Sequence, residues 1–146
     1  MSATFLIDVK NDASYKQSYF GTIASNATTN GTGVDLLTDS GPTHLIYQTG
    51  DVGDATTQVA IKIKQSDDNS TFTDVPSVGE FPGSVTLAGS ATVNDNQFGV
   101  VTTIYRSKRY VRAVVTTSGG SVISVPIAVG FLGRKKITGT GNGAQL

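Results

Sequence analysis

The feature of this sequence that most constrains its fold is an alternation of apolar and other residues with a period of two. It is clearest at residues 59–66, which read V-A-I-K-I-K-Q-S. Successive side chains of a strand point to opposite faces, so Val59, Ile61 and Ile63 are expected in a core and the two lysines in water. No window of a dozen residues carries a helical stripe, and the chain is therefore predicted to be all-β.

Turn residues mark the end of this first strand. The sequence D-D-N-S at residues 67–70 supplies short side chains that bond nearby backbone amides. The chain then returns through residues 71–75, with Phe72 as the large apolar residue, and we expect a hairpin here. Weaker strand candidates are residues 19–23, 33–37, 44–49, 84–87 and 98–105.

Two further strands are predicted in the last third of the sequence. Residues 109–117 alternate again, and residues 121–132 carry one long apolar row, formed by Ile123, Val125, Ile127, Val129 and Phe131. Pro126 lies on the other face of this strand, which is expected at an edge or bulged because proline cannot donate a ladder hydrogen bond. Seven or eight short strands with turns between them predict a β-sandwich, either jelly-roll-like or, as the alternative, immunoglobulin-like.

The length of 146 residues is ordinary for one domain, which at this size buries roughly 70% of the surface of its unfolded chain. We expect a single β-sandwich domain over residues 1–136 with an N-terminal arm at about residues 1–18, followed by a flexible glycine-rich tail at residues 137–146. The apolar run F-L-I at residues 5–7 is too short for a secretory signal or a membrane span. Synthesis in the cytoplasm and no membrane partner are therefore expected.

Charge is sparse and unevenly distributed. Charged residues make up 15% of the chain, against a typical value of about 25%, and an uncharged polar surface suits large protein contacts. Residues 1–95 carry all 11 acidic and 4 basic residues, whereas residues 96–146 carry 7 basic residues and no acidic one. Either strands of the two halves interleave and the asymmetry averages out, or a basic edge meets an acidic partner surface or nucleic acid.

Residues that could form a catalytic or metal site are few. The chain has no cysteine, and its single histidine, His44, lies in an apolar strand. Asp67 and Asp68 are adjacent in a turn, where they are not expected to converge on one substrate atom. The loop oxygen donors lack the spacing of a calcium loop; they are Asp51, Asp54, Asp67, Asp68, Asn69 and Asp95. We predict no enzymatic activity, metal, cofactor or small-molecule substrate.

Two basic segments are the candidates for contact with a partner. Residues 105–112, which read Y-R-S-K-R-Y-V-R, mix basic and aromatic side chains as single-stranded nucleic-acid sites do, or form a basic loop that leads into a strand. R-K-K at residues 134–136 ends the last strand and is either a solvated terminus or an anchor for an acidic surface. The candidate contact residues are Arg106, Lys108, Arg109, Arg112, Arg134, Lys135 and Lys136.

Parts of the sequence resemble a known class of proteins. Residues 59–75 read V-A-I-K-I-K-Q-S-D-D-N-S-T-F-T-D-V, and residues 109–115 read R-Y-V-R-A-V-V. Together with the opening segment, residues 8–20, they resemble small bacteriophage virion proteins that are encoded among head genes and are similar to capsid decoration or cement proteins. The resemblance covers the hairpin and the last two strands.

The resemblance implies a non-enzymatic, jelly-roll-like structural protein on the outside of an icosahedral capsid. It implies a homo-oligomer, a dimer or trimer, that binds the major capsid protein, and it transfers no catalytic residue to this chain. Binding to the assembled lattice and not to free subunits stabilises a shell by mass action.

Two alternative functions come from other classes. One is a receptor- or carbohydrate-binding module of a phage tail, against which the absence of Trp counts, because sugar sites stack rings on exposed aromatic residues. The other is a nucleic-acid-binding β-domain, which rests only on the basic second half, so nucleic acid is not the expected partner.

Overall fold

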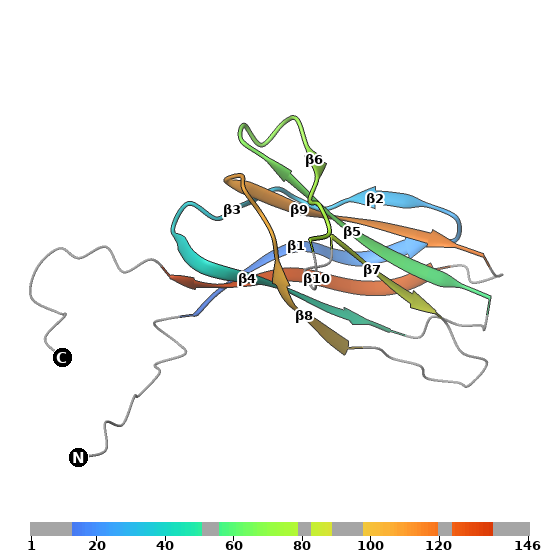
Figure 1. The fold of residues 1–146 in the computed structure, drawn as a ribbon. Coiled ribbons are helices and arrows are strands. Elements are labelled where there is room, and N and C mark those ends of the chain that lie inside the picture. Colours follow the sequence, from blue (N-terminus) through green and yellow to red (C-terminus); the bar gives the residue numbers. More distant parts are fainter. Residues whose placement is uncertain (1–12, 51–55, 79–82, 89–97, 120–123, 136–146) are drawn as a thin grey trace, which may run out of the picture.

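A computed structural model describes residues 13–50, 56–78, 83–88, 98–119 and 124–135. These residues form two antiparallel sheets that pack face to face (Figure 1). Sheet A has the order β1 (Ala13–Ala24), β10 (Ser124–Lys135), β4 (Asp39–Thr49) and β8 (Phe98–Ile104). Sheet B contains β2 (Thr28–Asn30), β3 (Val34–Asp35), β9 (Tyr110–Ser118), β5 (Gln58–Ser66), β6 (Thr73–Asp74) and β7 (Ser84–Ala88). The prediction of an all-β sandwich is confirmed.

The strand pairing is nested: strands from the start of the chain pair with strands from its end, and strands nearer the middle pair with each other. The first strand, β1, pairs with the last, β10; then β2 and β3 pair with β9, β4 with β8, and β5 with β7. The chain therefore crosses from one sheet to the other between most successive strands. An immunoglobulin sandwich instead begins with two neighbouring strands of the same sheet, so this order is that of the jelly roll.

The core lies where the alternation of the sequence predicted it. Val59, Ile61 and Ile63 of β5 are fully buried, whereas Lys62 is exposed on the outer face and Lys64 is half-buried there. The largest members of the core are Phe131, Ile23, Leu36, Leu45, Ile61 and Ile63. The predicted hairpin of residues 59–75 is confirmed, because β5 pairs with β6 through Lys64 and Asp74. Ile123 lies outside the described residues.

The strand that contains Pro126 differs from the prediction. It is an interior strand, because β10 pairs with β1 on one side and with β4 on the other, and Pro126 is in register with Thr22 without a bulge. The ladder with β4 begins only at Ile127, and the Pro126 carbonyl accepts a hydrogen bond from the Gly50 amide at 2.8 Å. The expectation of an edge or bulge was wrong because Pro126 lies just beyond the last ladder pair with β4, where a missing donor does not interrupt the ladder.

The start of β1 fastens one edge of sheet A to sheet B. Residues 13–18, part of the expected arm, belong to this strand, and a bulge between Gln17 and Tyr19 turns Ser18 inward. The Ser18 hydroxyl donates to the Thr32 carbonyl and accepts from the Ala113 amide, both at 2.9 Å. Gly31 is needed beside it, since a Cβ there would lie 2.5 Å from the Ser18 Oγ. The expected tail at residues 137–146 lies outside the described residues.

We predict that Ser18→Ala lowers the free energy of unfolding by about 1–3 kcal/mol, because it leaves the Ala113 amide and the Thr32 carbonyl without their buried partner. Urea denaturation followed by far-ultraviolet circular dichroism measures the change. The matched control is Ser124→Ala on the exposed start of β10, which should change stability by less than about 0.5 kcal/mol. Equal effects of the two substitutions would show that the hydroxyl of Ser18 does not join the sheets.

Candidate functional site

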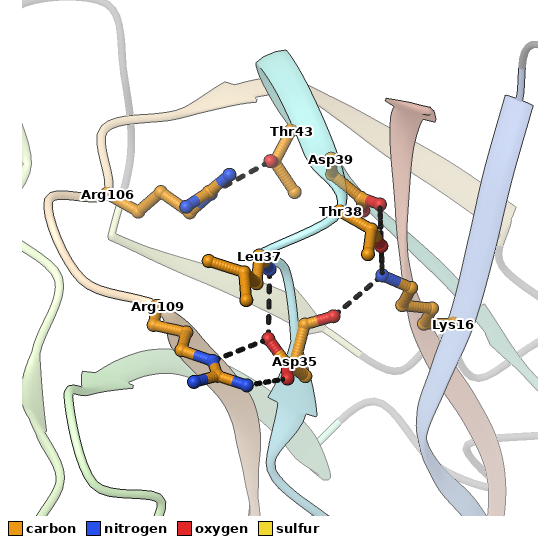
Figure 2. Close-up of polar contacts among 8 residues, drawn as sticks. All are labelled: Lys16, Asp35, Leu37, Thr38, Asp39, Thr43, Arg106 and Arg109. Carbon is orange, nitrogen blue, oxygen red and sulfur yellow. Dashed lines mark hydrogen bonds and ion pairs between the residues drawn. The ribbon is translucent and has the colours of Figure 1, made fainter. Parts of the chain in front are cut away.

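A cluster of charged side chains closes the end of the sandwich where β10 ends and β4 begins (Figure 2). We call this cluster the polar end; it consists of Lys16, Asp35, Asp39, Arg106 and Arg109. Lys16 is in register with the buried Phe131, so its side chain enters between the sheets. Its Nζ lies 2.9 Å from the Asp39 Oδ1 and donates to the Asp35 carbonyl at 2.6 Å.

Asp39 is the buried member of the polar end. Its side chain is 1% exposed, and its Oδ2 has no hydrogen-bond partner among the described residues. A buried carboxylate is costly unless it is paired, so the ammonium of Lys16 is needed to hold it there. The pair ties β1 to the start of β4 and serves the fold.

Asp35 and Arg109 form the exposed pair of the polar end. The Arg109 Nε donates to Oδ1 at 3.0 Å and an Nη to Oδ2 at 2.5 Å, a two-point contact that suits a planar guanidinium. The Leu37 amide also donates to Oδ1 at 2.9 Å. The hydrogen-bonded Arg109 lowers the pKa of Asp35 from 3.8 to about 2, and the Leu37 amide adds to this effect against the opposing cost of desolvation.

The two other cations of the segment before β9 also have partners inside the chain. Arg106 donates to the Thr43 hydroxyl at 3.1 Å and to the Lys108 carbonyl at 3.2 Å, and burial lowers the pKa of its guanidinium. The Lys108 Nζ lies 3.3 Å from a carboxylate oxygen of Asp67. The contacts of Arg106 with Thr43 and of Lys108 with Asp67, like the pair of Arg109 with Asp35, join residues from the acidic and basic parts of the sequence. They favour the interpretation that the charge asymmetry averages out in space.

Part of the mixture of basic and aromatic residues that suggested nucleic-acid binding is engaged within the chain, whereas Tyr105 is 54% exposed. The Arg109 guanidinium lies 4.8 Å from the centre of the Tyr110 ring, and that of Arg112 lies 4.0 Å from the centre of the Phe72 ring. One face of each ring is thus covered by a cation of the same chain. Bases stack on open aromatic faces, so the covered faces of Tyr110 and Phe72 are not open to a single strand.

The last two described residues of β10 are placed differently. Arg134 and Lys135 are both exposed at the polar end. Arg134 has no ion pair within the ranges that the structure describes, and it is in register with Ala13 and Ser40, which carry no charge. Lys136 lies outside the described residues. Among the predicted contact residues, Arg134 is therefore the cation that the chain itself leaves available.

The turn at residues 66–71 uses its carboxylate to hold backbone. Asp68 accepts hydrogen bonds from the Ser66 hydroxyl at 2.7 Å and from the amides of Ser70 and Thr71 at 2.9 and 2.8 Å. The Ser66 hydroxyl above all, with these amides, lowers the pKa of Asp68 well below its usual range. The predicted turn role of Asp68 is confirmed.

His44 is the remaining candidate for metal or catalytic chemistry that lies in the described part of the chain. His44 lies on the outer face of sheet A, and within the described ranges no group of three or more potential metal ligands occurs. Asp51, Asp54 and Asp95 lie outside those ranges. No helix in the described part of the chain is long and apolar enough to cross a membrane.

Sequence reasoning missed one surface, the outer face of sheet A. Phe20 of β1 is 78% exposed on this face and borders an open hollow of about 280 Å³. Gln48, Pro126 and Ala128 also line the hollow. The signal was present in residues 124–132, whose outward positions include proline, alanine and leucine and no charged residue. A strand that is apolar on both faces has a second surface to cover.

Comparison with known proteins bears on the fold. No protein-family model matches the chain, and no curated protein is similar to it at a significant level. Among solved structures, the fold is similar to that of the PBSX exported protein XepA, with a TM-score of 0.55 and 14% sequence identity. The match covers 99% of this chain and 44% of that one, so this chain spans less than half the length of its structural neighbour.

We predict that Asp35 titrates near pH 2 in the folded protein. Because this pKa lies below the value of 3.8 expected for the unfolded chain, the pair with Arg109 stabilises the fold above about pH 4 and loses its effect as the pH falls toward 2. The pair is exposed, so its contribution to stability is small, and carboxyl chemical shifts are the better measurement.

The substitution Arg109→Gln should return the pKa of Asp35 toward 3.8. Lys108→Gln is the matched control, because Lys108 contacts Asp67 and not Asp35, and it should leave the titration of Asp35 unchanged. A wild-type Asp35 that titrates near 3.8 would contradict the two-point contact with Arg109.

Proposed function

We propose that this chain is a non-enzymatic structural protein of a bacteriophage that binds the outer surface of the assembled capsid as a decoration or cement protein. The observation that carries the bacteriophage part of the proposal is the likeness to PBSX exported protein XepA, a phage protein, over 99% of this chain. The resemblance of residues 59–75 and 109–115 to small virion proteins supports the same assignment from the sequence. The major capsid protein is the proposed partner.

The end of β10, which lies beside the polar end, supplies the proposed contact with the shell. Three of the candidate cations, Arg106, Lys108 and Arg109, bond to groups of their own chain. Arg134 at the end of β10 is exposed, and it forms no ion pair with any residue in the described part of the chain. An exposed guanidinium with no internal partner can meet a carboxylate of a capsid surface, and such rim charges chiefly set association rate and salt dependence.

We expect the purified chain to co-sediment with mature capsids of its own phage in a saturable manner, and not with unassembled capsid subunits. The assay is run at low and moderate salt, where an electrostatic contact weakens as salt is added. Shells with bound protein should also lose their structure at a higher temperature than bare shells, because the ligand binds only the assembled state. If no binding to shells occurs at either salt concentration, the decoration role is wrong, and oligosaccharides and DNA become the next ligands to test.

Charge reversal at Arg134 tests the surface. Arg134→Glu should weaken binding to shells by about 10-fold or more, because it replaces attraction to an acidic surface with repulsion. The matched control is Lys62→Glu, an equal change of charge on the outer face of sheet B at a side chain that is 53% exposed; it should alter affinity by less than about 3-fold. Equal losses in both variants would assign the effect to net charge and not to the polar end.

A further inference from the structure

The outer face of sheet A is a continuous surface without formal charge between the strand ends. Cross-strand pairing arranges the side chains of β1, β10 and β4 in rows: Tyr15 with Leu132 and His44, Gln17 with Gly130 and Ile46, Phe20 with Ala128 and Gln48, and Thr22 with Pro126. None of these rows contains Asp, Glu, Lys or Arg. The outer face of sheet B differs, since Lys62, Lys64 and Asp74 form ion pairs on it.

This face carries both a protruding ring and a depression. The Phe20 ring is 78% exposed, which is unusual for a large apolar side chain in the middle of a strand. The adjoining hollow measures about 280 Å³ and is lined mainly by apolar atoms of residues such as Pro126, Ile127 and Ala128. A cavity of about 150 Å³ can hold a benzene ring, so this hollow has room for a phenyl side chain.

The size of the face fits a contact between two small proteins. β1 and β10 contain 12 residues each, β4 contains 11 and β8 contains 7. At about 3.3 Å per residue and about 4.8 Å between strands, the whole sheet, with β8 and the charged strand ends included, covers roughly 650 Å². A standard interface buries about 800 Å² per partner, and transient ones bury less, so a dimer formed by this face is expected to be of modest affinity.

We propose that two copies of this chain associate through the outer faces of sheet A around a two-fold axis, with the Phe20 ring of each copy in the hollow of the other. A two-fold contact needs a self-complementary surface, and the ring and the hollow lie side by side on one face. The absence of formal charge in the rows removes like-charge repulsion between identical surfaces. It also gives an acidic or basic partner nothing to pair with. The inference does not depend on the proposed binding to capsids.

Sedimentation velocity of the full chain from about 1 to 300 µM should show a monomer–dimer equilibrium with a dissociation constant of about 1–100 µM. Phe20→Asp should raise this constant by about 30-fold or more, because it would bury an unpaired carboxylate. The matched control is Val78→Asp, the same change of charge at a site between β6 and β7 that is 42% exposed; it should leave the constant within about 2-fold. Raising the salt concentration should not weaken the dimer, because its contact is apolar.

Phe20→Ala removes the ring without adding charge and should weaken the dimer in the same direction, which separates loss of the contact from an effect of the new carboxylate. Thermal denaturation checks that each variant is folded, as expected for a site that is 78% exposed. A wild-type chain that stays monomeric at the highest concentration, a trimer, or a dimer unchanged by both Phe20 substitutions would overturn the proposal. A monomer that bound soluble oligosaccharides through Phe20 would overturn it too and assign the face to a glycan.

Discussion

The burial of one face of β10 is the constraint on which the rest of the structure depends. This strand lies inside sheet A, between β1 and β4, and its inward residues Val125, Val129 and Phe131 are almost completely buried. A slip of one residue in either pairing would turn that row toward solvent, so the register of both neighbours is set by it. The outward positions of β10 are fixed at the same time. The hollow beside Phe20 and the exposed end at Arg134 are consequences of the same register.

The inward side chains also explain how the sandwich is closed at one end. Lys16 occupies an inward position, where an apolar residue would be expected in the middle of a strand. Because it lies near the end of the sheets, the Lys16 ammonium reaches Asp39 and the Asp35 carbonyl. Lys16 therefore extends its hydrocarbon stem along the core and holds a carboxylate that is otherwise shielded from water. At the same end, Arg109 and Lys108 neutralise Asp35 and Asp67 from distant parts of the sequence. Most of the formal charge there is used to close the fold.

The main strands could be predicted from the sequence, whereas the order in which they pair could not be derived from it. Strands β5, β9 and β10 follow from alternation, since the period of two is a local property of the chain. The short strand β2 has no such signal. Pro126 was assigned to an edge or a bulge because the sequence does not show locally where the neighbouring strand ends. The sequence also did not show which cations have a partner within the chain. Arg109 and Asp35 are 74 residues apart, and only the nested pairing of strands brings them together.

The two proposed contacts adjoin on the molecule, and their physical consequences combine. Arg134 lies at the end of β10, in register with Ala13 and Ser40, and this row follows the row of Tyr15, Leu132 and His44 at the end of the outer face of sheet A. A two-fold pair of chains carries two copies of Arg134. On a repeating lattice that places acceptors at a matching distance, the second contact becomes intramolecular, and overall affinity can exceed that of one contact by about 10²–10⁴. Modest affinity in each contact is then sufficient for stable attachment to an assembled shell.

The same pair gains nothing from isolated capsid subunits, because these offer one acceptor at a time. In the proposed function, discrimination between shell and subunit therefore arises from geometry and needs no additional specific contact.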